Sequence, residues 1–569
     1  MKQQLIECVP NFSEGRDMNI INSIRAAIES VEGIEILDVD PGAATNRTVV
    51  TFVGEPSAVV EAAYRGAVRG AELIDMRHHH GAHPRMGATD VLPLVPVSGI
   101  TLEECAELAR ALANRLATEA GIPCYAYEAA ALRPERKNLA VCRRGEYEAL
   151  AERFATPDEA PDYGARPWDD AAARTGATAV GARDFLIAVN FNLNTTSTRR
   201  ANAIAFDVRE KGRPAREGGK LTGKPLAGPD GKPLMIPGTL KGTKAIGWYI
   251  DEYGIAQVSM NITDIAATPL HVAFDEVCRA AAARGIRVTG TEIVGVVPER
   301  VLLDAGRHFL HRQQRSTGIP DREIIRMAIK SMGLDELKPF DPAEKVIEYM
   351  IAARRPSVKS LVNFTCRAFA EETASESPAP GGGSVAAYLG ALAGALGAMV
   401  ANLSAHKAGW DERWREFSDV AERGNALMER LLHLVDADTE AFNRIMAALS
   451  MPKGTDAEKE ARGAAMEAAT LHAAQVPLVT AQTALETFEV LRYVAGHGNP
   501  ASASDAGVGA LCARAAVRGA ALNVRINAAG LADTEAARRL IDDAAEAEAQ
   551  AAEAETAVLD IVNAKISGR

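Results

Sequence analysis

The chain has 569 residues and a formal net charge of −12 at pH 7. Single hydrophobic cores stop growing beyond about 250 to 300 residues, so two to four domains are expected. The acidic balance argues against a nucleic-acid binder, and an anionic ligand would need a local basic patch.

The cysteines and the N-terminus indicate the compartment. The seven cysteines are scattered, with no CxxC pair. This argues against a disulfide framework and a cysteine zinc site, and it fits a reducing environment. The N-terminal MKQQLIECVPNF lacks the apolar stretch and cleavage site of a signal peptide. We therefore expect a cytoplasmic protein.

In the first third of the chain, strand patterns alternate with helical patterns, and the order is βαββαβαβ. Pro56 in a first turn and the Thr101–Glu104 capping box mark two helix starts. Strands are expected at 5–12, 34–40, 47–54, 90–97 and 122–129, and helices at 19–31, 55–76 and 101–121.

The next stretch repeats the order βαββαβ. Two adjacent units of this kind predict an α/β half made of two related ferredoxin-like subdomains. The strands are expected at 184–193, 244–252, 256–264 and 286–297, and the helices at 196–210 and 269–285.

Residues 209–244 form an insertion rich in Gly, Pro and Lys, for which no regular element is predicted. The insertion has nine basic and three acidic residues. It fits either a solvated loop, which we favour, or a flexible basic arm near an anionic ligand.

From about residue 360, helical spacing runs to the end and predicts an all-α helical-bundle domain. Residues 385–403 have the length of a membrane span but are mostly Ala and Gly, so we interpret them as a buried bundle helix. Gly390 and Gly394 allow another helix to approach closely there. A long helix capped by Asp533 is expected at 533–566. The predicted domains are 1–182, 183–351, a linker at 352–359, and 360–569.

The segment RHHHGAHPRMG, residues 77–87, holds four of the eleven histidines. His79 and His83 have the spacing of two metal ligands on a helix, but Gly81 and Pro84 break a helix there. A catalytic zinc needs three protein ligands, and only Asp75 and Asp90 lie nearby in sequence. An acid–base histidine is favoured because imidazole titrates near neutral pH, while a metal site and a solvated loop stay open.

The segment LDVDPGAATNRTVV, residues 37–50, places Asp38 and Asp40 at an expected strand end, with Arg47 following. A carboxylate there can orient a histidine, and an arginine can clamp a substrate carboxylate. A purely structural turn explains the pattern equally well.

Two motifs in the helical half are candidates. In SPAPGGGSVAA, residues 377–387, the glycines and Ser384 precede a helix, which favours contact with an anion or cofactor over a merely flexible helix start. In VDAD, residues 435–438, Asp436 and Asp438 face different sides of a helix. At least one is expected near the interior, where a raised pKa suits an acid; the alternative is that both are exposed.

Together these motifs resemble the bifunctional formimidoyltransferase–cyclodeaminase family of histidine degradation, over nearly the whole chain. The resemblance is carried by ECVPNFSEG (7–15), LDVD (37–40), TNRTV (45–49), HPRMG (83–87), RGEYEAL (144–150), TGATAVGARDFLIA (175–188), APGGGSVAA (379–387) and VDADTEAF (435–442).

The resemblance implies two reactions. The first half would transfer the formimino group of N-formimino-L-glutamate to N5 of tetrahydrofolate, and the second would form 5,10-methenyltetrahydrofolate and ammonia. It implies His83 as the acid–base residue of the transfer and Asp40 as its carboxylate partner. Asp438 would give a proton to the departing ammonia.

The resemblance also implies where folate binds. A folate-contacting loop is expected at 164–176, between Gly164 and Gly176, where Tyr163 and Trp168 can stack on an aromatic ring. A second folate is expected near the helix start of the last domain. The implied substrate-binding and folate-binding residues are Tyr163, Gly164, Trp168, Gly176, Arg47, Gly382, Gly383 and Ser384.

Tetrahydrofolate, with a polyglutamate tail, is the expected co-substrate, and no metal is expected. The family implies a homo-oligomer, a ring of dimers, with no membrane or nucleic-acid partner. Three alternatives stay open: one active half only, a decayed folate-binding scaffold, or a metal-dependent amidohydrolase built on the cluster at 78–83.

Overall fold

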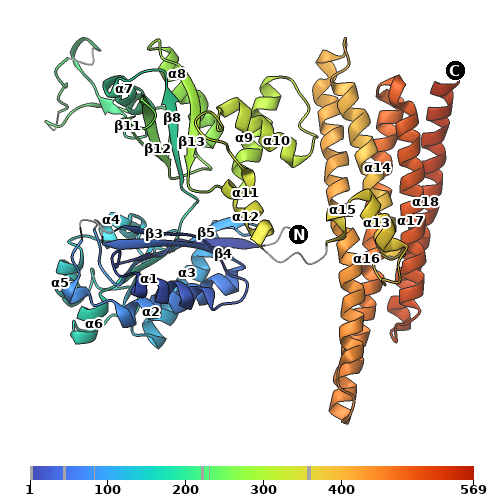
Figure 1. Ribbon diagram of the computed structural model, residues 1–569, viewed down its shortest axis with the longest axis horizontal. Helices are drawn as coiled ribbons and strands as arrows, with labels where there is room; N and C mark the ends of the chain where they lie inside the picture. The colour runs from blue at the N-terminus through green and yellow to red at the C-terminus, as the bar shows by residue number, and fades with distance from the viewer. Residues whose placement is uncertain are drawn as a thin grey trace. The chain divides into compact units, whose positions relative to one another are not determined.

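The chain folds into two compact units. The computed structural model describes residues 4–42, 46–81, 84–219, 223–229, 231–354 and 360–568. The first unit comprises Met1–Val301 and Met332–Arg354, and the helical unit comprises Leu302–Ser331 and Arg355–Arg569. Figure 1 colours the chain from blue at the N-terminus to red at the C-terminus.

A seven-stranded sheet organises the N-terminal subdomain of the first unit. From one edge its order is β3, β4, the interrupted strand β1/β2, β5, β7 and β6, antiparallel up to β5 and parallel from β5 to β6. Helices α1, α2 and α3 lie along one face (Figure 1). The bounds are β1 Leu5–Cys8, β2 Asn11–Phe12, α1 Met18–Glu29, β3 Glu35–Gly42, β4 Arg47–Gly54, α2 Pro56–Leu73, β5 Thr89–Ser98, α3 Leu102–Glu119, β6 Cys124–Glu128 and β7 Thr178–Ala182.

A four-stranded antiparallel sheet organises the next subdomain, with the order β11, β12, β8, β13. In both sheets the third strand of the unit pairs with the first, the second pairs with the third, and the fourth pairs with the first on its other side. The predicted βαββαβ order is therefore present twice. The bounds are β8 Ile187–Leu193, α7 Thr198–Val208, β11 Thr243–Ile250, β12 Ile255–Ile262, α8 Leu270–Ala282 and β13 Val288–Val294.

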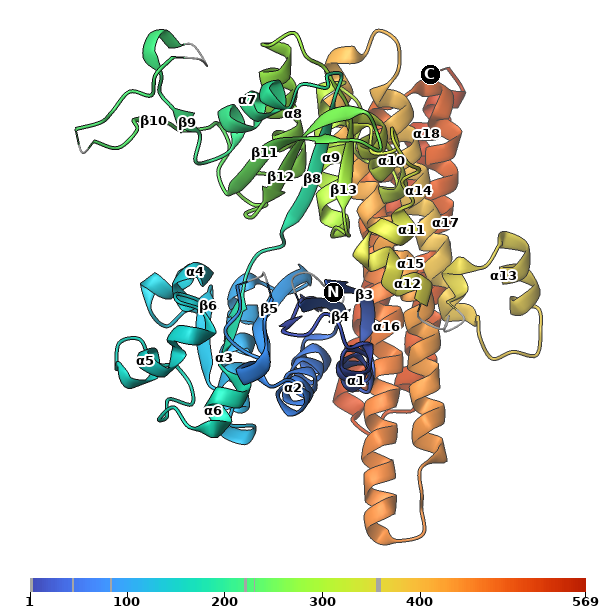
Figure 2. The same ribbon diagram turned by 60° about the vertical axis from the view of Figure 1, so that its left-hand side comes forward.

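The insertion at 209–244 is not free of regular structure, so that prediction is wrong. Strand β9, Arg213–Pro214, pairs antiparallel with β10, Met235–Ile236, in the arm seen in Figure 2. Gly212, in the left-handed region at φ +65, has no side chain to block the crossing strand. Backbone groups pair across the arm, as where Ala215 N donates to Leu234 O.

The long helices α14 to α18 form a bundle in the helical unit (Figures 1 and 2). Asp533 caps the last helix by accepting hydrogen bonds from two backbone N–H groups, as predicted. The bounds are α13 Cys366–Thr373, α14 Gly382–Ala405, α15 Trp414–Ser450, α16 Asp456–His497, α17 Ala503–Ala528 and α18 Thr534–Ile566.

Helix α14 lies in the interior of this bundle. Within the described ranges it is a helix long and apolar enough to cross a membrane, yet 61% of its most apolar window is buried. A Cβ atom on Gly394 would lie 3.0 Å from the carbonyl oxygen of Gly424 on α15. The glycines therefore permit close helix packing, which agrees with the interpretation as a bundle helix.

The stretch 302–331 packs with the helical unit, whereas the predicted boundaries put it in the second subdomain. It contains most of α9, Glu299–Arg312, and α10, Asp321–Met332. Thr317 N donates to Ser418 Oγ at 3.0 Å, and Asn402 Nδ2 donates to Gly318 O at 2.7 Å. These contacts join the turn between α9 and α10 to α14 and α15.

Gly87 and Gly176 cross each other in the first unit as an isolated antiparallel bridge. Gly176 has φ +65, and a Cβ there would overlap the carbonyl oxygen of Met86. The crossing fixes the chain directly after the histidine segment, and it requires glycine for both conformational and steric reasons.

The variant Gly176→Ala is expected to destabilise the first unit by at least about 3 kcal/mol, because left-handed strain and overlap add. Gly33→Ala is the matched control: φ is +83 there and nothing lies within 4 Å. It should lose only about 1 kcal/mol. Denaturant unfolding followed by circular dichroism compares the two. Equal losses would contradict a steric role for the crossing.

Candidate active sites

A large charged cavity of about 1520 Å³ lies in the first unit. Its wall mixes basic and acidic side chains with apolar residues such as Val91 and Leu186. A cavity of this volume is large enough for a drug-sized ligand. The charged lining residues are Arg47, Arg85, Arg143, Arg183, Lys244, Glu128, Glu146, Glu148, Asp184 and Asp264.

The histidine segment borders this cavity. His80, Gly81, Pro84 and Arg85 line it, whereas the predicted acid–base residue His83 lies outside the described residues. The side chain of His79 is buried, and its Nε2 lies 2.8 Å from the carbonyl oxygen of Asn46, to which it donates. Burial lowers the pKa of His79, so the ring stays neutral and serves as a structural donor.

In the described ranges, no group of three His, Cys, Asp or Glu side chains is placed to hold a metal ion. His78 ends the short 3-10 helix Met76–His78 and is exposed. The three consecutive histidines therefore differ: His78 is exposed, His79 is a buried hydrogen-bond donor, and His80 lines the cavity.

A polar network holds the chain after the histidine segment. Arg85 pairs with Glu148 at 2.7 Å, and Met86 N donates to Asp90 Oδ1 at 2.9 Å. Asp90 is completely buried and pairs with Arg143, which reaches the cavity. None of the four charged residues of this network was a predicted site residue, although HPRMG contains Arg85, and RGEYEAL contains Glu148 and follows Arg143. The Asp90–Arg143 pair has low exposure on both sides and suits a rigid site, because a buried charge needs a partner.

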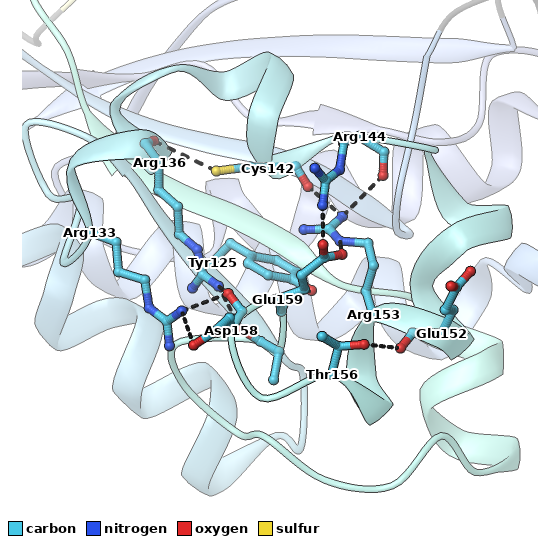
Figure 3. Close-up of polar contacts among 11 residues, drawn as sticks. Tyr125, Arg133, Arg136, Cys142, Arg144, Glu152, Arg153, Thr156, Asp158 and Glu159 are labelled. Carbon is cyan, nitrogen blue, oxygen red and sulfur yellow. Dashed lines mark hydrogen bonds and ion pairs between the residues drawn. The ribbon is translucent and has the colours of Figure 1, made fainter.

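Figure 3 shows a polar network among residues of β6 and of the segment that follows it in the chain. The guanidinium groups of Arg136 and Arg153 lie 5.0 and 4.6 Å from the ring centroid of Tyr125. Arg153 also donates to the carbonyl oxygen of Cys142 at 2.7 Å. This hydrogen bond therefore fixes the backbone next to Arg143.

Asp40 and Arg47 lie on paired strands. Asp40 is exposed on β3, opposite Val49. Asp40 was predicted to lie at a strand end, but β3 continues to Gly42, so that prediction is wrong. Arg47 is half-buried and lines the cavity. Burial is the main cause that lowers the pKa of Arg47, while the carboxylates of Asp90 and Asp40 oppose this effect. The structure thus brings Arg47 to the cavity.

None of the four residues predicted to contact folate around the loop at 164–176 is among the described residues that line the cavity. The ring of Trp168 packs edge-on against Phe154 and Tyr147, at centroid distances of 5.1 and 5.9 Å. Tyr163 exchanges backbone hydrogen bonds with Cys124, and Gly164, at φ +70, packs against Ala117. Gly176 forms the crossing described above.

A second, smaller pocket of about 140 Å³ lies in the helical unit at the start of α14. It unites residues from both predicted motifs: Gly382 and Gly383 from α14, and Asp438 from α15. Asn523 and Asn527 of α17 complete its polar wall and were not predicted. A Cβ on Gly383 would overlap the carboxylate of Asp438, so only glycine allows this approach.

Ser384 connects the two motifs. Its side chain is fully buried, and its hydroxyl lies 3.0 Å from both Asp438 Oδ2 and the carbonyl oxygen of Val435. Burial raises the pKa of Asp438, and hydrogen bonds from the side chain and backbone of Ser384 oppose this without cancelling it. A carboxyl of this kind can carry a proton at a pH where an exposed aspartate has lost it.

Asp436 lies on a different helix face from Asp438, as expected, and makes different contacts. Its carboxylate accepts hydrogen bonds from Ser360 Oγ at 2.6 Å and Leu361 N at 2.7 Å. Asp436 therefore fastens the chain before α13 to α15, and Asp438 faces the pocket.

The two aspartates should respond oppositely to replacement by asparagine. Because burial raises the pKa of Asp438 above its unfolded value, its ionised form weakens the fold at neutral pH. Asp438→Asn should therefore melt at the same or a higher temperature at pH 7, and this advantage should vanish near about pH 4. Asp436→Asn should lose about 1 kcal/mol, because an amide replaces an oxygen that accepts a hydrogen bond. A lower melting temperature for Asp438→Asn at pH 7 would refute this assignment.

Known proteins match all three parts of the chain. Residues 5–183 match the formiminotransferase domain, N-terminal subdomain; residues 188–352 match the formiminotransferase domain; and residues 365–546 match formiminotransferase-cyclodeaminase.

Among individual proteins, formimidoyltransferase-cyclodeaminase of Gallus gallus is 41% identical over 93% of both chains. Glutamate formimidoyltransferase of Streptococcus pyogenes is 39% identical over 54% of this chain and 93% of its own length. The crystal structure of formiminotetrahydrofolate cyclodeaminase from Thermotoga maritima is 27% identical, with a TM-score of 0.32, and covers 36% of this chain and 98% of its own. The chain belongs to the formimidoyltransferase-cyclodeaminase family.

Proposed function

We propose that the chain carries out two consecutive reactions. The first unit transfers the formimino group from N-formimino-L-glutamate to N5 of tetrahydrofolate. The helical unit converts 5-formiminotetrahydrofolate to 5,10-methenyltetrahydrofolate and ammonia. The observation that carries the proposal is the buried carboxyl of Asp438 beside the glycine-rich start of α14, in a unit separate from the charged cavity.

For the transfer we propose His83 as the proton carrier. The attacking N5 must lose a proton and the departing glutamate nitrogen must gain one, and one imidazole can do both in turn. In support, the neighbours Gly81 and Pro84 line the cavity. Asp40 is proposed as the carboxylate partner and Arg47 as a clamp for a substrate carboxylate.

For ring closure we propose Asp438 as the acid. N10 attacks the carbon of the formimino group, and the nitrogen of that group leaves as ammonia after gaining a proton. A carboxyl whose pKa is raised by burial is suited to deliver this proton. Gly382, Gly383 and Ser384 would lie against the folate at this pocket.

Several finer points are part of the same proposal. The two subdomains of the first unit would be ferredoxin-like, supported by their shared strand order. The protein would act in the cytoplasm as a ring of dimers on polyglutamylated folates. Folate contact by Tyr163, Gly164, Trp168 and Gly176 stays a prediction.

The two activities should separate by mutation. His83→Ala should lower formimino transfer at least about 100-fold and leave cyclisation of supplied 5-formiminotetrahydrofolate intact, while Asp438→Asn should do the reverse. The absorbance of 5,10-methenyltetrahydrofolate and the release of ammonia report the steps. His78→Ala and Asp436→Asn are matched controls, expected within about threefold of wild type while folded. Loss of both activities in one folded variant would contradict two separate sites.

The amidohydrolase alternative makes a different prediction about metal. We expect both activities to persist after treatment with a chelator, because imidazole and carboxyl groups carry the protons here. Metal analysis of the purified protein accompanies the assay. About one zinc per chain, together with loss of activity on chelation, would favour a hydrolase built on the histidine cluster.

A further inference from the structure

Glu128 places a carboxylate in the wall of the large cavity. It ends β6, lies half-buried and lines the cavity close to Tyr127 and Ala129. Within the described ranges its carboxylate forms no hydrogen bond and no ion pair. The basic side chains that attract it at longer range are Arg183 and Lys244. A partly desolvated carboxylate with unused acceptor capacity is costly unless a ligand supplies donors.

The backbone of Glu128 is also unusual. Its φ is +52, in the left-handed region that residues with a side chain enter at a cost. The conformation is enforced on both sides, since Ala129 N donates to Ala182 O at 3.0 Å and Ala130 N donates to Tyr127 O at 3.2 Å. A glycine would adopt this turn without strain, and yet a glutamate stands here and faces the cavity.

Glu146 provides an internal comparison. It also lines the cavity and also has a positive φ, of +56. Its carboxylate, however, pairs with Arg85 at 3.2 Å, so a structural contact accounts for its charge. Glu128 has the same two features, and the described part of the chain gives it no such contact. The difference points to a ligand as the missing partner of Glu128.

The charge of Glu128 is consistent with a donor ligand. Burial raises the pKa of its carboxyl, and the positive charges of Arg183 and Lys244 oppose this shift. The two oxygens of the ionised group can accept two parallel N–H bonds from one planar group, the arrangement that makes such pairs strong.

We propose that Glu128 binds a planar pair of N–H donors that flank one carbon atom of a substrate. This inference rests on the proposed function, whose two substrates each offer that edge. In N-formimino-L-glutamate it is the amidine, and in tetrahydrofolate it is the ring N3–H together with the 2-amino group. Glu128 is thereby a binding residue for the transfer reaction, distinct from the proposed proton carrier His83.

The test is Glu128→Gln, which keeps the shape but replaces one acceptor oxygen by a donor. We expect the KM of the contacted substrate to rise at least about tenfold, with kcat within about threefold of wild type. Glu135→Gln is the matched control, because Glu135 is an exposed glutamate in the segment after β6 and does not line the cavity. Its KM values should not change.

The two substrates are measured separately, so the source of the donor edge is also identified. A rise confined to the KM of N-formimino-L-glutamate assigns the amidine, and a rise confined to that of tetrahydrofolate assigns the pterin edge. Unchanged KM values for both would overturn the inference and leave the proposed function intact. A wild-type protein without transferase activity would instead overturn the proposed function.

Glu128→Gly distinguishes a binding role from a structural one. It removes the carboxylate and relieves the backbone strain, so the melting temperature should stay equal or rise while KM increases as in Glu128→Gln. A fall in melting temperature of several degrees in both variants would show that Glu128 holds the fold, and would overturn the inference.

Discussion

The helical unit depends on one constraint. A buried carboxylate must approach the start of a helix closely, and this is possible only where that helix has a glycine. Asp438 can reach the first turn of α14 only because position 383 is glycine, and the hydroxyl of Ser384 meets it there. Desolvation and hydrogen bonding act on this carboxyl in opposite directions, and desolvation prevails. Because its pKa is raised, this carboxyl keeps its proton to a higher pH than an exposed aspartate, which is a property that the proposed acid needs.

In the first unit, paired charges hold the chain around the cavity. Its cavity is lined by both signs, and the chain around the histidine segment is held by Arg85 with Glu148 and by Asp90 with Arg143. Each pair joins segments that are distant in sequence, so the wall is rigid where the pairs lie. Against this background, the carboxylate of Glu128 is an exception, because the described part of the chain gives it no ion pair. The ligand proposed for Glu128 would supply that partner, and strained backbone of this kind is common at active sites.

Patterns local in sequence predicted the structure well. The alternation of apolar residues indicated both βαββαβ repeats, and the small residues of α14 indicated a buried helix. The two-residue spacing of Asp436 and Asp438 correctly put them on different helix faces, one fastening the chain and one facing a pocket. The meeting of Gly383, Ser384 and Asp438 in space was expected only from the family resemblance.

Features that depend on distant contacts could not be predicted. Gly318 packs against α15, and no local pattern encodes that partner. The ribbon in the insertion forms through backbone pairing, which composition does not reveal. The edge-on contacts of Trp168 with Phe154 and Tyr147 likewise join residues that are separated in sequence. The positive φ of Glu128 could not be predicted from the sequence either, because most residues with a left-handed backbone conformation are glycines.

The central claim is that two separate sites act in succession on one folate, and mixing two inactive variants tests it most directly. Neither His83→Ala nor Asp438→Asn should convert N-formimino-L-glutamate and tetrahydrofolate to 5,10-methenyltetrahydrofolate alone. An equimolar mixture should form the product after a lag, as 5-formiminotetrahydrofolate made by one variant reaches the other. A mixture that forms no product, although both variants are folded and 5-formiminotetrahydrofolate accumulates, would contradict the account.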